Sequence, residues 1–252
     1  MAYIEYLDDE VSKALVKDVL DIGRVKKDAV IKDFQKNVID PFASLFDSAV
    51  SDVDHNTWKS SEMVRQCQKT LTNHIGNLHQ KILGNVSGWE DLGTGSEVDL
   101  VCHQQKIIAE VKNKHNTVTG GKLADQYKTL ANLVNPKASR FRGYTAYFVN
   151  IIPKKPERFN KCFTPSDKST GMQLAADEGI RIIDGASFYS LVSLRENALE
   201  ELYDALPKII EAIFRNDYGL PDFSIPDQSM FRQYFIDAYH DTRPKQITMT
   251  NV

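Results

Sequence analysis

The chain has few cysteines and no long apolar run, and both shortages exclude whole classes of protein. Its three cysteines share no CxxC spacing, so we expect neither a disulfide framework nor a cysteine-rich zinc site. The N-terminus carries acidic residues where an export signal carries basic ones, and no apolar run reaches the length of a membrane span. We therefore expect a cytoplasmic protein with no membrane-embedded segment.

Acidic residues are scarce in the middle of the chain. From His103 to Lys168 there are 13 Lys and Arg against 4 Asp and Glu, whereas the rest of the chain has 18 against 30. The overall net charge of -3 hides this asymmetry. A basic segment within an otherwise acidic protein predicts a polyanionic partner that binds one face.

The N-terminal part of the chain has helical patterns. Apolar residues recur at helical spacing through the first 50 residues, and Asp40-Pro41 interrupts the pattern. A long amphipathic helix follows, which Ser60 or Ser61 could cap and which Gly84 would end.

The middle of the chain alternates between strand and helix patterns. EVDLVCH and KIIAEVKNK predict two antiparallel strands joined by a tight turn. The later elements that we expect are a helix from about Lys122 to Leu133, a strand from Tyr144 to Pro153, a basic loop, a strand in GIRIIDGASF, and a helix from Leu199 to Phe214. This order predicts an α/β protein with a mixed central sheet flanked by helices and a helical N-terminal region.

A chain of 252 residues can bury a sizeable core as one domain. We expect a helical region at 1–58, a catalytic α/β core at 59–195 with the site at 97–114, and a C-terminal helical region and tail at 196–252. The tail ends in polar residues, and we expect its last few residues to be disordered.

The two predicted strands bring charged residues together. Side chains at i and i+2 of a strand point the same way, so Glu110, Lys112 and Lys114 share one face. Pairing of the strands brings Asp99 to the same end of the hairpin. Two carboxylates repel each other unless a cation lies between them, and Mg²⁺ accepts a few oxygen ligands while keeping positions for water and a phosphate oxygen. A neighbouring ammonium can orient the attacking water and offset transition-state charge, so this group predicts phosphodiester cleavage.

Asp99, ten intervening residues, and then Glu110-Val111-Lys112 resemble the PD-(D/E)XK nuclease motif. The segment around this motif is similar to type II restriction endonucleases, in particular those that cut GGNCC-type or GGWCC-type sites. The resemblance implies that Asp99 and Glu110 hold Mg²⁺, that Lys112 acts on the nucleophilic water, and that the sheet is restriction-endonuclease-like.

Two further features concern the same resemblance. Glu62, on the helix before the hairpin, resembles the additional acid that many members place near the site. Val98 stands where many members have a proline before the first acid, which weakens the motif match without altering its chemistry.

The resemblance also implies partners. They are double-stranded DNA with a short palindromic site, a second copy of the chain to cut the other strand, and a cognate DNA methyltransferase in the host. The dimer could form through the N-terminal helices or the C-terminal helices. The basic segment and its flanks supply the candidates for DNA contact, which are Asn113, Lys114, Lys122, Arg140, Arg142, Lys154 and Lys155.

Other interpretations share parts of this pattern. Asp, Glu and Lys are common surface residues, so an exposed hairpin could show the same spacing. Against this, we expect KIIAEVKNK to bury Ile108 and Val111 on one face and to present Glu110 and Lys112 on the other. A repair or junction-resolving nuclease of the same fold, a non-catalytic DNA-binding protein, and a helical protein that binds an acidic partner stay open. The histidines form no metal-binding motif.

Overall fold

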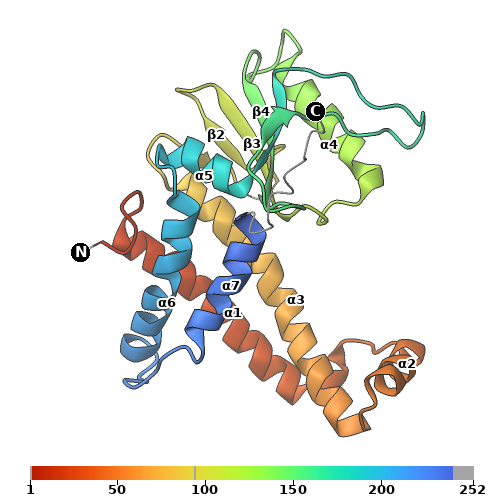
Figure 1. Ribbon diagram of the computed structural model, residues 1–252, viewed down its shortest axis with the longest axis vertical. Coiled ribbons are helices and arrows are strands. Elements are labelled where there is room, and N and C mark those ends of the chain that lie inside the picture. Colours follow the sequence, from red (N-terminus) through yellow and green to blue (C-terminus); the bar gives the residue numbers. More distant parts are fainter. Residues whose placement is uncertain (1, 94, 241–252) are drawn as a thin grey trace, which may run out of the picture.

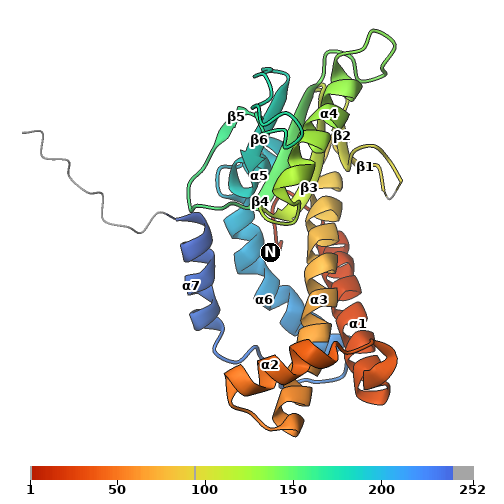
Figure 2. The same cartoon turned by 90° about the vertical axis from the view of Figure 1, so that its right-hand side faces the viewer.

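The computed structural model describes residues 2–93 and 95–240. It has an α/β part, in which helices cover a sheet, and long helices that extend away from one end of that sheet (Figures 1 and 2). The helices are α1 Asp9–Lys32, α2 Pro41–Ser51, α3 His55–Gly84, α4 Leu123–Val134, α5 Gly185–Ser193, α6 Ala198–Asn216 and α7 Gln228–Tyr239, with short 3-10 turns at Phe34–Lys36 and Gly120–Lys122. Within the described residues, no helix is both long enough and apolar enough to cross a membrane.

The predicted start of the long helix α3 was wrong. The helix begins at His55, because the carboxylate of Asp54 accepts a hydrogen bond from the backbone N–H of Thr57 at 2.8 Å. Ser60 and Ser61 lie inside the helix, where their hydroxyls donate to backbone carbonyls four residues earlier. The helix therefore crosses the expected boundary near residue 58 and links the N-terminal helices directly to the α/β core.

The predicted end of α3 at Gly84 is confirmed. A Cβ atom at Gly84 would lie 2.7 Å from the backbone nitrogen of Asp91, closer than real Cβ contacts allow. Only glycine lets the first strand pass so close to the helix end.

The six-stranded sheet has the order β1-β2-β3-β4-β6-β5. Its strands are β1 Glu90–Asp91, β2 Leu100–Cys102, β3 Ile107–Lys114, β4 Thr145–Ile152, β5 Asn160–Cys162 and β6 Ile180–Asp184. Strands β2 and β3 form the predicted antiparallel hairpin, whereas β3, β4 and β6 run parallel. The mixed α/β sheet is confirmed, and the parallel strands end at one edge, which we term the carboxyl edge.

Three elements differ from the sequence-based expectations. The short strand β5 lies within the expected basic loop and pairs with β6. The strand expected over GIRIIDGASF ends at Asp184, whose carboxylate caps α5 by accepting from the backbone N–H of Ser187 at 2.9 Å. Helix α7 was not predicted within the aromatic tail, and the residues expected to be disordered at the very end lie outside the described part.

Apolar side chains cover both faces of the sheet. On one face Phe148 packs with Ile108 and α4, and on the other Tyr147 packs with Val111, α5 and the long helices. Ile108 and Val111 therefore lie on opposite faces of β3, and the expectation that they share a face was wrong. Strand β3 is central, so its first residues are buried on both sides.

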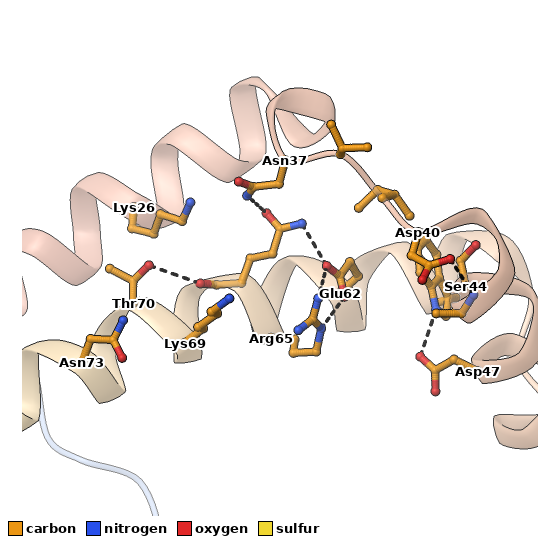
Figure 3. Close-up of a pocket in the computed structure, with 15 residues that line it drawn as sticks. Lys26, Asn37, Asp40, Ser44, Asp47, Glu62, Arg65, Lys69, Thr70 and Asn73 are labelled. Atoms are coloured by element: carbon orange, nitrogen blue, oxygen red, sulfur yellow. Dashed lines mark hydrogen bonds and ion pairs between the residues drawn. The ribbon is translucent and has the colours of Figure 1, made fainter. Parts of the chain in front are cut away.

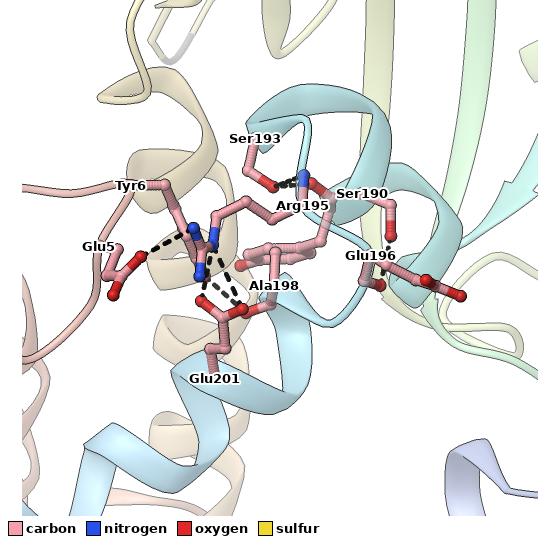
Figure 4. Close-up of polar contacts among 9 residues, drawn as sticks. Glu5, Tyr6, Ser190, Ser193, Arg195, Glu196, Ala198 and Glu201 are labelled. Carbon is pink, nitrogen blue, oxygen red and sulfur yellow. Dashed lines mark hydrogen bonds and ion pairs between the residues drawn. The ribbon is translucent and has the colours of Figure 1, made fainter.

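Two polar regions shape the helical part. Helices α1, α2 and the first half of α3 line a polar hollow (Figure 3). At the other end, the N-terminal segment binds the junction of α5 and α6: the hydroxyl of Tyr6 donates to the carbonyl of Ala198 at 2.8 Å, and Arg195 pairs with both Glu5 and Glu201 (Figure 4). Burial raises the pKa of the Tyr6 hydroxyl, so it stays a hydrogen-bond donor.

Candidate active site

The backbone of Asp99 belongs to the sheet, one residue before β2. Its N–H donates to the carbonyl of Ala109 at 3.0 Å, and its carbonyl accepts from the N–H of Leu92 at 2.9 Å. Its side-chain Oδ2 accepts a hydrogen bond from the backbone N–H of Val111 at 2.7 Å. Asp99 is thereby held between the segment after β1 and the middle of β3.

Glu110 and Lys112 lie on the α4 side of β3, near its carboxyl end. The register of the parallel strands places them beside Phe148 and Asn150 of β4. The Nζ atom of Lys112 lies 2.5 Å from Oε1 of Glu110, and the two side chains are 23% and 16% exposed. The carboxylate of Glu110 and the ammonium of Lys112 are therefore in contact and partly buried. An exposed hairpin with ordinary surface charges would not need such a contact.

The electrostatics of Asp99 show that the three charged groups share one environment. Burial and then the carboxylate of Glu110 raise the pKa of Asp99 from 3.8 to about 6, while the N–H of Val111 and the ammonium of Lys112 oppose this rise. Two carboxylates that disfavour each other's charge are suitable oxygen donors for a hard divalent cation. The described residues contain no group of three or more His, Cys, Asp and Glu placed to hold a metal.

Two neighbouring polar residues escaped the sequence interpretation. Asn150 is 7% exposed, and its Oδ1 atom has no hydrogen-bond partner among residues 2–93 and 95–240. A polar residue within the apolar run YFVNII was the available sequence signal. Asp91 of β1 lies opposite Leu100 and contributes to the raised pKa of Asp99, and its Oδ1 accepts from Gln80 at 2.7 Å.

The structure does not bring Glu62 to this group. Its carboxylate accepts hydrogen bonds from Arg65 and Gln66 in the polar hollow, and the bond from Arg65 lowers its pKa (Figure 3). The helix meets β3 further along, where the side-chain amide of Asn113 lies 3.5 Å from the carbonyl of Thr72. Ten helical residues separate Glu62 from Thr72, a rise of about 15 Å.

The candidates for DNA contact fall into three places. Lys114, Lys122, Lys154 and Lys155 are exposed around the carboxyl edge, because β3 and β4 end there and α4 begins there. Arg140 and Arg142 are exposed before the start of β4, roughly 23 Å away along that strand at 3.3 Å per residue. Asn113 faces α3, since its Cβ would lie 3.4 Å from one built at Gly76.

A mixed sheet flanked by helices, with two acids and a lysine on adjoining strands, has the architecture of a restriction-endonuclease-like nuclease. Residues 4–215 match the family model described as Eco47II restriction endonuclease. The chain belongs to this family of type II restriction enzymes.

Two relatives support this membership. The chain is 54% identical over 239 residues to the type II restriction enzyme Eco47II of Escherichia coli, across 95% of this chain and 100% of that protein. It is 30% identical over 207 residues to the type II restriction enzyme Sau96I of Staphylococcus aureus, across 81% of this chain and 74% of that protein. The chain is a type II restriction endonuclease, and the predicted function and enzyme class are confirmed. The repair-nuclease, binding-protein and interaction-protein alternatives are not supported.

Proposed function

We propose that the chain hydrolyses phosphodiester bonds of double-stranded DNA at a short palindromic site of GGNCC or GGWCC type, with Asp99, Glu110 and Lys112 as its catalytic residues and Mg²⁺ as its cofactor. The observation that carries this proposal is the geometry around β3. The backbone contact of Asp99 with Val111 and the 2.5 Å contact of Lys112 with Glu110 set two acids and an ammonium in one partly buried group.

Asp99 and Glu110 would hold Mg²⁺. Both are oxygen donors, and the raised pKa of Asp99 reflects a charge that the protein alone leaves poorly compensated. A bound Mg²⁺ would lower the pKa of its water and neutralise charge on the phosphate.

Lys112 would bind the attacking water and offset charge on the reacting phosphate. Its ammonium would lose Glu110 as a partner if that carboxylate held a cation. Asn150 lies in register beside Lys112, and its buried Oδ1 accepts no hydrogen bond from the described residues, so it would accept one from the ammonium and hold it in position. The arrangement would keep Lys112 oriented through the reaction.

The exposed lysines of the carboxyl edge, Lys114, Lys122, Lys154 and Lys155, would contact phosphates on either side of the cleaved bond. Arg140 and Arg142 would contact DNA further from the scissile bond, and the position of Asn113 against α3 favours a structural role for this residue. We further propose that residues 1–252 act as a single nuclease domain, that two copies cut the two strands, and that a cognate methyltransferase protects the host DNA in the cytoplasm.

Substitution of both Glu110 and Lys112 by Ala tests the site. Mixed-sequence phage DNA is incubated with purified protein in Mg²⁺ or in EDTA. We expect the wild type to give discrete bands only with Mg²⁺, and the double variant to give none while it keeps its circular dichroism and most of its DNA affinity. Glu62→Gln is the matched control, because it changes an acid on α3 outside the site, and it should cut normally. Cleavage by the double variant, or loss of cleavage in Glu62→Gln, would refute the assignment.

A further inference from the structure

Helix α2 turns its apolar face toward the solvent. Phe42, Leu45, Phe46 and Val50 share one helical face by their spacing, and they are 76%, 73%, 71% and 86% exposed. Every residue of α2 is at least partly exposed. The helix lies at the end of the molecule away from the sheet (Figures 1 and 2). This orientation is the reverse of that expected for an amphipathic helix on a monomeric protein.

Polar contacts on its inner side fix this orientation. Oδ2 of Asp47 accepts a hydrogen bond from the indole N–H of Trp58 on α3 at 3.0 Å, and the hydroxyl of Ser48 donates to the carbonyl of Val53 at 2.7 Å. Ser44 and Ser48 are half-buried, and Ser44 and Asp47 line the polar hollow (Figure 3). Rotation of α2 to bury its apolar face would separate Asp47 from Trp58, so this contact with α3 opposes such a rotation.

The exposed apolar surface is large enough to form an interface. Side chains of this size and exposure present on the order of 600 Å² of apolar surface per copy, so two copies would bury roughly 1,200 Å², which reaches the lower bound of a stable interface. A contiguous patch of this size is uncommon on monomeric proteins unless it binds a partner.

We propose that the outer face of α2, formed by Phe42, Leu45, Phe46 and Val50, is the interface through which two copies of this chain form a two-fold dimer. Asp47 is the only charged residue of α2 and is bonded on the inner side, so the face has no cation to attract phosphate. An uncharged apolar face can pack against its own copy without like-charge repulsion. The choice of a second copy rests on the proposed function, because a palindromic site presents the same target on both strands.

Helix α7 is the alternative surface, since it exposes Met230, Phe231 and Tyr234. It differs from α2 because it already buries Phe235 in the core and because Arg232 binds Glu200 and Asp204 of α6. Helix α7 therefore already packs against the chain through a buried aromatic residue and an ion pair, whereas α2 has no buried residue.

The test compares a double variant, Leu45→Glu with Phe46→Glu, against the control Met230→Glu, which puts one glutamate on the exposed side of α7. Sedimentation velocity without DNA should give twice the 28.5 kDa chain mass for the wild type and the control, and the chain mass for the double variant with an unchanged circular dichroism spectrum. On a plasmid with one site, the double variant should accumulate nicked circles, because each monomer cuts a single strand. A monomeric wild type, a dimeric double variant, or dissociation by Met230→Glu would overturn the proposal.

A second measurement tests the interface in case the Leu45→Glu and Phe46→Glu double variant does not fold. Phe46→Cys should be joined to its partner by a short thiol cross-linker beyond the wild-type level, and Met230→Cys should not; equal cross-linking of the two would also overturn the interface. Failure of the proposed function looks different. If the wild type is dimeric but cuts no DNA with Mg²⁺, the catalytic proposal is refuted and the α2 interface is not. If the wild type is monomeric and cuts DNA, the α2 interface is refuted and the catalytic proposal is not.

Discussion

Substitution of Asp99 by Asn should stabilise the metal-free protein while it abolishes cleavage. The folded protein raises the pKa of Asp99 from 3.8 to about 6, chiefly through burial and the nearby Glu110 carboxylate. Because the folded pKa lies above the unfolded one, the stabilisation that protonated Asp99 contributes is present below about pH 4 and is lost as the pH rises through 6. Asn has the shape of the acid, can accept the same bond from Val111, and carries no charge at any pH.

The size of the effect follows from the difference between the two pKa values. A difference of about two units corresponds to roughly 3 kcal/mol of unfolding free energy at pH 8. For a chain of this length we expect the melting temperature of Asp99→Asn to exceed that of the wild type by roughly 5 to 10 °C at pH 8. The two proteins should have nearly equal stability near pH 4.

Urea unfolding in EDTA across pH 4 to 8 measures the difference directly. Glu97→Gln is the control, because Glu97 is exposed two residues away and its neutralisation should leave the pH dependence as in the wild type. If Asp99→Asn and the wild type show the same pH dependence, the carboxylate of Asp99 does not experience the burial and repulsion that the structure indicates. A gain in stability together with normal cleavage would contradict the catalytic role instead.

Three further predictions concern the support of the site, the sheet and the DNA surface. Asn150→Ala should lower the single-turnover cleavage rate roughly 10- to 100-fold with unchanged DNA affinity, since it removes an acceptor beside Lys112, the lysine that we propose as catalytic; a parallel loss of affinity would contradict this positioning role. Gly185→Ala should lower the free energy of unfolding in urea by about 1 to 3 kcal/mol, because its Cβ would overlap a backbone carbonyl of β4. Gly76→Ala should not lower the free energy of unfolding, because the space beside Gly76 can hold a Cβ. Joint replacement of Lys154 and Lys155 by Ala should reduce the slope of log affinity against log salt by about 2, and an unchanged slope would exclude phosphate contacts there.

The amino-acid sequence by itself determined the hairpin and its charged group. The turn between β2 and β3 is short, the apolar residues on both sides fit strands, and Glu110 and Lys112 are two residues apart, so local geometry alone places them on one face. Gly84 likewise marked the end of α3, although the need for glycine there comes from the close approach of Asp91 in the first strand. Short β5 and the helices α5 and α7 were missed, since a three-residue edge strand has no period to detect and a buried strand that passes directly into a helix shows one continuous apolar run.

Only the tertiary structure decided which distant residues meet. Glu62 lies on the same helix that contacts β3, but the rise of that rigid helix keeps it about 15 Å from the contact. Asn150 joins the charged group because β4 runs parallel to β3 in one register, and strand register depends on long-range pairing. Ile108 and Val111 are both buried because β3 is covered on both sides, and α2 exposes its apolar face while the carboxylate of Asp47 on its inner side accepts a hydrogen bond from Trp58. Strand alternation by itself separates Ile108 from Val111, but periodicity along one chain cannot show what packs against each face.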